Sequence, residues 1–117
     1  MKRLLLILAI TALTGCSTIK QYWPKNHDPV MFSQLVAVDL AIKHVDCNKP
    51  DWAEARRIAE QLSQYTEWRN DPQTVNIKGL FVFTDRAGKS SSKAFCELGK
   101  QTASQRIQAA KSAWEGR

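Results

Sequence analysis

The stretch that decides the fold runs from Asp28 to Val45 and reads DPVMFSQLVAVDLAIKHV. Asp28 is a favourable N-cap, and Pro29 suits the first turn of a helix, where its missing N–H has no intrahelical partner. Apolar residues then recur at alternating spacings of four and three, the pattern of one helix face: Met31, Leu35, Val38, Ile42 and Val45. Because Pro50 disfavours a helical conformation at the residue before it, we predict that this helix ends between Cys47 and Pro50.

Two further helices follow from the same kind of pattern. One is predicted from Pro50-Asp51 to about Arg69, with an apolar face of Ala55, Ile58, Leu62 and Tyr65, widened by Trp52, Ala59 and Trp68. Its solvent-facing side is expected to hold Glu54, Arg56, Arg57, Glu60 and Gln61. The other begins after candidate N-caps at Ser90–Ser92 and runs to about Trp114. Its core face is expected to hold Phe95, Leu98, Ala103, Ile107, Ala110 and Trp114.

The segment between these helices, residues 73–88, allows two interpretations. Its apolar residues alternate as in a strand, and Leu80-Phe81-Val82-Phe83 is a β-prone run. However, no second convincing strand is found to pair with it, and two-stranded structures are marginal. We therefore predict a third short helix with its apolar residues buried, and keep a short strand or irregular segment over residues 75–84 as the alternative. The expected fold is all-α, a small domain of three to four helices.

Length and composition limit the class of protein. The chain has 117 residues, of which 44% are hydrophobic and 24% charged. These values fit one small globular domain and exclude a multidomain enzyme or a multi-pass membrane protein.

The first 16 residues carry an export pattern. Lys2 and Arg3 precede an uncharged run from Leu4 to Leu13. A membrane-spanning helix needs about 20 apolar residues, so this run is too short to span and fits the core of a signal peptide. Leu13-Thr14-Gly15-Cys16 then resembles the lipobox of bacterial lipoproteins. The alternative is an ordinary secretory signal that happens to be followed by a cysteine.

The lipobox resemblance implies an anchored protein. It implies cleavage between Gly15 and Cys16, a diacylglycerol on the Cys16 thiol and an N-acyl chain on the new amine; no metal or other cofactor is expected. Several acyl chains hold a protein on a membrane where one chain binds only marginally. By analogy, Ser17 in place of Asp implies the outer membrane of a Gram-negative host, with the domain facing the periplasm.

The resulting organisation has three parts. Residues 1–15 are the cleaved signal peptide, residues 16–28 the lipidated N-terminus and tether, and residues 29–117 the helical domain. Cleavage leaves 102 of the 117 residues and lowers the net charge from +6 to +4, because Lys2 and Arg3 are removed.

The two remaining cysteines are predicted to form a disulfide. An exported domain folds in an oxidising compartment, and Cys47 and Cys96 have only one possible pairing once Cys16 carries lipid. Two unpaired buried thiols are the alternative. A zinc site built from His27, His44, Asp46 and the two cysteines is disfavoured, because the close spacings typical of zinc ligands are missing.

The sequence contains no local signature of catalysis, such as a nucleophile elbow, a zinc-protease motif or a glycine-rich phosphate loop. A weaker alternative is an enzyme in which a pair of carboxylates acts on a cell-wall sugar. The candidate carboxylates are Glu54, Glu60, Glu67 and Glu97. We therefore expect no enzyme activity and no small-molecule substrate. Although the pI of about 9.5 is typical of nucleic-acid-binding proteins, export excludes that partner.

The remaining expectation is a binding function. Tryptophan and arginine are common in binding hot spots, so the predicted partner-binding residues are Trp52, Trp68, Trp114, Arg56 and Arg57. Core packing near the helix ends is the other role considered for the tryptophans. The leading prediction is a non-enzymatic outer-membrane lipoprotein whose domain binds another envelope protein. The alternative is a phage or plasmid lipoprotein for receptor blocking, superinfection exclusion or spanin-like lysis.

Overall fold

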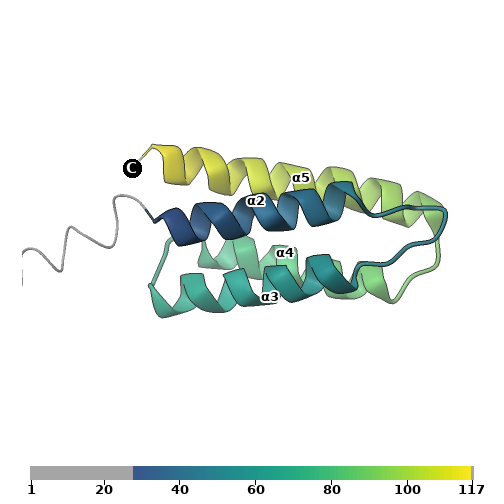
Figure 1. Ribbon diagram of the computed structural model, residues 1–117, viewed down its shortest axis with the longest axis horizontal. Helices are drawn as coiled ribbons and strands as arrows, with labels where there is room; N and C mark the ends of the chain where they lie inside the picture. The colour runs from purple at the N-terminus through teal and green to yellow at the C-terminus, as the bar shows by residue number, and fades with distance from the viewer. Residues whose placement is uncertain (1–27, 117) are drawn as a thin grey trace, which may run out of the picture.

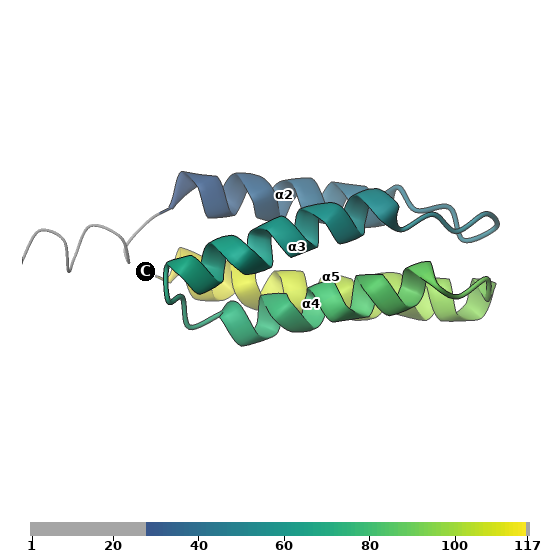
Figure 2. The same ribbon diagram turned by 90° about the horizontal axis from the view of Figure 1, so that it is seen from below.

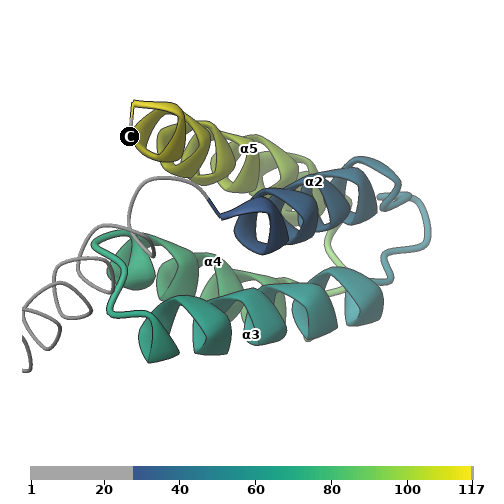
Figure 3. The same cartoon turned by 60° about the vertical axis from the view of Figure 1, so that its left-hand side comes forward.

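The protein is an antiparallel bundle of four helices in a computed structural model that describes residues 28–116. The helices are α2 (Pro29–Lys43), α3 (Ala53–Trp68), α4 (Thr74–Gly88) and α5 (Lys93–Glu115). Helices α2 and α5 form one layer, and α3 and α4 form the other (Figures 1 and 3). Each helix packs on two neighbours, α3 on α2 and α4, and α5 on α4 and α2. The predicted all-α fold is confirmed. The predicted signal peptide, lipobox and nearly all of the tether lie outside the described residues.

Helix α2 has the predicted apolar face but ends earlier than predicted. Its five predicted core residues are buried: Met31, Leu35, Val38, Ile42 and Val45. The helix stops at Lys43, so the predicted end between Cys47 and Pro50 is wrong. From there the chain continues as a loop to α3. In this loop Val45 is buried and Asp46 accepts a hydrogen bond from the Asn48 N–H at 2.9 Å.

Residues 74–88 form helix α4, so the strand alternative over residues 75–84 is wrong. The residues that decide this recur at helical rather than strand spacing and are buried: Ile77, Leu80, Thr84 and Ala87. Two apolar residues of the helix are exposed, Val75 at 82% and Val82 at 40%, and Phe81 and Phe83 are half-buried. The prediction that all apolar residues of this segment are buried is therefore wrong for these two valines.

The core face of α5 is rotated from the predicted one. Phe95 and Leu98 are 37% and 61% exposed, and Cys96 and Gly99 face the core in their place. The missing side chain of Gly99 leaves room for the Phe83 ring, which lies edge-on to the buried Trp52 at 6.2 Å between centroids. Small residues at positions 96 and 99 thus allow the neighbouring helix and its aromatic rings to approach closely.

Helix α3 differs from its predicted face at the C-terminal end. Trp68 is 75% exposed, and the core positions of the last turns belong to Ser63 and Thr66. The Thr66 hydroxyl donates to the Ser63 carbonyl at 2.8 Å, so a buried polar side chain is satisfied within its own helix. Asn70 follows with φ of 51°, a left-handed conformation that asparagine tolerates better than most residues, and the chain turns into α4.

Side-chain contacts close the end of the bundle at which α2 begins. Asp28 is 6% exposed and caps α2 by accepting from the Val30 N–H at 2.9 Å. Its other oxygen accepts from the Tyr65 hydroxyl at 2.9 Å and pairs with Arg69 at 2.7 Å. These contacts join the start of α2 to the end of α3.

The end of α5 is held at the same end of the bundle. The indole N–H of Trp114 donates to Asp71 at 3.1 Å, which fixes the last turns of α5 against the α3–α4 turn. Together, the Asp28 contacts and this hydrogen bond connect all four helices at this end of the bundle.

Substitution of Gly99 tests the close approach between α4 and α5. A Cβ at this position would lie 2.6 Å from the Phe83 ring, so Gly99→Ala is expected to lower the free energy of unfolding by about 1–3 kcal/mol through overpacking. Urea unfolding measures the change. Gly116→Ala is the control, because the nearest atom to a Cβ there is 3.5 Å away. An unchanged stability in Gly99→Ala would show that Phe83 moves aside without cost.

Candidate functional site

The disulfide lies at the other end of the bundle. The structure joins Cys47 in the α2–α3 loop to Cys96 in α5, with 5.5 Å between their Cα atoms, in line with the pairing expected from the sequence. Close by, the Lys100 ammonium donates to the carbonyls of Lys43 at 3.0 Å and Val45 at 2.8 Å. The charge of Lys100 thus meets the negative end of the α2 dipole.

The described residues bring no cluster of metal ligands together around these cysteines. Within residues 28–116, no group of three His, Cys, Asp or Glu side chains could hold a metal ion. The sulfurs of Cys47 and Cys96 are bonded to each other, and His44 is exposed at the end of α2. His27 lies outside the described residues.

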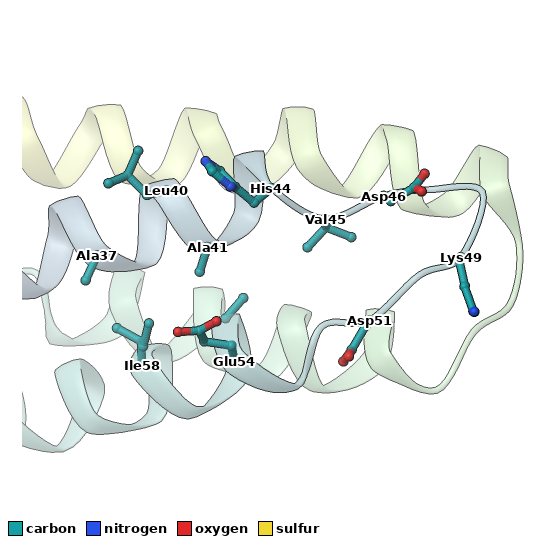
Figure 4. A pocket seen from close by; sticks show the side chains of 11 residues that line it. Ala37, Leu40, Ala41, His44, Val45, Asp46, Lys49, Asp51, Glu54 and Ile58 are labelled. Carbon is teal, nitrogen blue, oxygen red and sulfur yellow. The ribbon is translucent and has the colours of Figure 1, made fainter.

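A groove of about 540 Å³ separates the end of α2 from the start of α3. Its floor is apolar and includes Ala41, Val45 and Ile58, and its rim is mostly acidic (Figure 4). The carboxylate of Glu54 points from α3 toward α2, whereas Asp46 and Asp51 point in different directions from the loop (Figure 4). The acidic groups therefore do not converge on one point of the groove.

The four glutamates considered as catalytic carboxylates are spread over two helices. Glu54, Glu60 and Glu67 belong to α3, and Glu97 belongs to α5. Of these four, only Glu54 lines the α2–α3 groove. The described residues thus offer no paired arrangement of these glutamates across a cleft.

The predicted partner-binding residues do not form one surface. Trp52 and Trp114 are 1% and 3% exposed and belong to the core, so their prediction as binding residues is wrong. They are buried because both indole rings pack against other aromatic rings, Trp52 on Phe83 and Trp114 on Phe32. Trp68 is exposed, but it lies 12 residues after Arg56 on α3, about 18 Å along the helix axis.

The two predicted arginines differ in their surroundings. Arg57 is exposed, whereas Arg56 pairs with Asp85 of α4 at 2.7 Å and lies over the Phe81 ring, 5.6 Å from its centroid. Arg56 therefore serves first to join α3 to α4.

The cationic neighbours of Asp85 lower the pKa of its carboxylate. Hydrogen bonds from Arg56 and then Lys89 lower the pKa of Asp85 below its ordinary value of 3.8. Any stabilisation from this carboxylate is present above pH 3.8 and is lost as the pH falls through the lowered pKa. We expect Arg56→Gln to raise the pKa of Asp85 toward 3.8 and Arg57→Gln to leave it unchanged. Carboxyl ¹³C NMR titration measures both, and an unmoved Asp85 pKa in Arg56→Gln would contradict the assignment.

A second groove, of about 450 Å³, lies between α4 and α5, which run side by side along the bundle (Figure 2). It is lined by Val75, Lys78, Gly79, Val82, Phe83, Arg86, Thr102 and Arg106. Two exposed apolar residues of α5 continue it. The Phe95 ring lies 6.0 Å from the Phe83 ring, and Leu98 precedes Thr102 by one helical turn. We call these ten residues the α4–α5 face.

The cations of the α4–α5 face have no carboxylate opposite them. None of its ten residues is acidic, and within the described part of the chain neither Lys78 nor Arg86 forms an ion pair. The Arg106 guanidinium lies across Gly79, where a Cβ would be 2.5 Å from Nη1. It donates to the backbone carbonyl and the side chain of Asn76 at 3.4 and 3.3 Å.

The sequence pattern did not reveal this face, because it predicted core positions for Phe95 and Leu98, which are exposed in the structure. The signal that could have found it is the spacing of Val75, Lys78, Val82 and Arg86, which share one side of α4 without matching its buried residues.

We also compared the chain with known proteins. The chain matches no protein-family model, no curated protein and no solved structure.

Proposed function

We propose that this protein is a lipid-anchored, non-enzymatic binding module of the bacterial envelope, whose helical domain binds another envelope protein through the α4–α5 face. The observation that carries the proposal is the exposure of apolar residues in one place beside three cations. Val75, Val82 and Leu98 are 82%, 40% and 61% exposed. A row of such residues around a groove is characteristic of an interaction site.

The anchoring part of the proposal comes from the sequence. The lipobox-like Leu13-Thr14-Gly15-Cys16 supports acylation of Cys16, and the Cys47–Cys96 pair suits an oxidising compartment outside the cytoplasm. Among residues 28–116 no helix is both long and apolar enough to cross a membrane. Attachment through acyl chains on Cys16, with Ser17 directing the protein to the outer membrane, is the arrangement we propose.

Substitution of the lipidated cysteine tests the anchor. Cys16→Ser is expected to remove the protein from the outer-membrane fraction and to leave it soluble or unprocessed, because no thiol remains for the lipid. Ser17→Asp is the matched variant and should move the protein to the inner membrane. Membrane fractionation with metabolic labelling by palmitate measures both. Continued outer-membrane fractionation and labelling of Cys16→Ser would refute the anchor.

A further inference from the structure

We infer that the α4–α5 face binds an acidic amphipathic helix of the partner protein. This inference rests on the proposed function, because it names the chemistry of the partner segment at the same face. It follows from the length and shape of the groove, from the placement of its cations and from the charge of the rest of the domain.

The dimensions of the face match a short helix. From Val75 to Arg86 the α4 backbone advances eleven residues, about 16 Å at 1.5 Å per residue, which is about three helical turns. Along this length Val75 and Val82 lie seven residues, about two helical turns, apart on α4, which matches the i and i+7 positions of a helix laid in a groove.

The shape of the face favours a helix over a bilayer surface. Phe83 is half-buried on the floor between α4 and α5, and the Arg106 guanidinium covers Gly79 beside it, whereas Val82 and Leu98 on the sides are exposed. A ridge of side chains on a partner helix fills such a groove, as when two helices pack ridge into groove. A flat bilayer surface would touch only the sides and would leave the floor without contacts.

The charges of the face select an acidic partner. Lys78 and Arg86 are exposed without ion pairs among the described residues, and Arg106 is held over Gly79 by Asn76. A guanidinium fixed in this way loses less side-chain entropy when it binds a carboxylate. Glutamate or aspartate residues flanking the apolar side of the partner helix would therefore be attracted to the edges of the groove.

The cations of the face are not part of a generally basic surface. Residues 28–116 contain 12 Lys and Arg against 11 Asp and Glu, so the described domain is almost neutral. A face with three basic and no acidic residues is a local asymmetry in such a domain. The acidic rim of the α2–α3 groove, with Asp46, Asp51 and Glu54, provides the opposing charge elsewhere.

Site-specific photocrosslinking tests the inference. A benzophenone amino acid is placed at Val82, on the face, or at Leu40, exposed on α2, in the full chain within the producing cells. We expect the Val82 probe to capture one protein. The crosslinked peptide should show apolar residues at helical spacing with flanking Asp or Glu.

Charge reversal provides the second arm of this experiment. Lys78→Glu with Arg86→Glu should lower the Val82 crosslink about tenfold, because like charges then oppose the partner. Lys49→Glu with Arg57→Glu makes the same change of charge away from the face and should leave the yield unchanged. Replacing the partner's acidic residues with lysine should restore the yield in the first variant. Since all four residues are exposed, circular dichroism should show both variants folded.

The outcomes separate the inference from the proposed function. If the Val82 probe captures lipid, a second copy of this chain or a peptide without acidic residues, the inference is overturned. If only the Leu40 probe captures a protein, the binding function stands, but the α4–α5 face is not the binding site and the inferred acidic helix is wrong. If neither probe captures a protein, both proposals fail. An equal loss of crosslinking in the two charge-reversal variants would also overturn the inference.

Discussion

Removal of the Cys47–Cys96 disulfide is expected to lower the free energy of unfolding by about 4 kcal/mol. The two cysteines are 49 residues apart, and a cross-link over that distance restricts the unfolded chain by about this amount in the chain-entropy model. A domain of this size has a total stability of about 5–15 kcal/mol, so the loss is a large share of the whole. We expect the reduced domain to be marginally folded.

Urea unfolding of the oxidised protein, the reduced protein and the Cys47→Ala/Cys96→Ala variant measures this effect. Alanine is chosen because Cys96 is 2% exposed, and a serine hydroxyl there would add a burial cost of its own. The double-alanine variant should unfold at the same urea concentration with and without reductant. Two titratable thiols in the untreated protein, or a change below about 1 kcal/mol on reduction, would contradict the prediction.

Asp28→Ala is expected to lower the free energy of unfolding by about 3 kcal/mol. The substitution removes the α2 cap, the acceptor of the Tyr65 hydroxyl and the ion pair with Arg69 together. The Asp28 side chain is 4% exposed, and loss of one partner from a buried pair commonly costs about 3–5 kcal/mol. We expect the lower end of this range because the Arg69 side chain, 25% exposed, keeps part of its contact with water.

Asp39→Ala is the matched control for this substitution. Asp39 lies on the same helix and pairs with Lys43 at 2.8 Å, but the lysine side chain is 60% exposed. Exposed pairs one turn apart contribute about 0.3–0.5 kcal/mol, so Asp39→Ala should change stability little. Thermal and urea unfolding compare the two variants. Equal losses of unfolding free energy in the two variants would show that the burial of Asp28 does not strengthen its contacts.

The sequence was sufficient to predict the buried face of α2 and the fold class, although not the end of α2, because the apolar residues repeat at helical spacing. Every residue of the predicted face from Met31 to Val45 is both apolar and correctly spaced, so hydrophobicity and periodicity indicate the same side. In residues 74–88 the two periodicities compete. The absence of a partner strand correctly favoured the helix, because a lone strand leaves its backbone groups unpaired.

The core face of α5 could not be predicted in the same way. Hydrophobicity favours Phe95 and Leu98 as the core-facing residues of α5. The close approach of α4 and the disulfide to Cys47 instead place Gly99 and Cys96 there. The burial of Gly99 and Cys96 depends on contacts with residues that are far away in the sequence. The α4–α5 face could be located only in part from the sequence. The spacing of Val75, Lys78, Val82 and Arg86 marks one side of α4, but the exposure of Val75 or Leu98 depends on which helices cover it.

The positions of the tether and the disulfide determine how the domain carries mechanical load. The chain enters at Asp28, and the Cys47–Cys96 bond lies at the far end of α2 (Figure 1). A pull between the tether and α5 can therefore peel α2 away one turn at a time, beginning at the Asp28 contacts. The tension then passes through the disulfide and bypasses α3 and α4, which lie inside the covalently closed loop. Residues 28–46 can extend by tens of ångströms while α3 and α4 stay shielded from force.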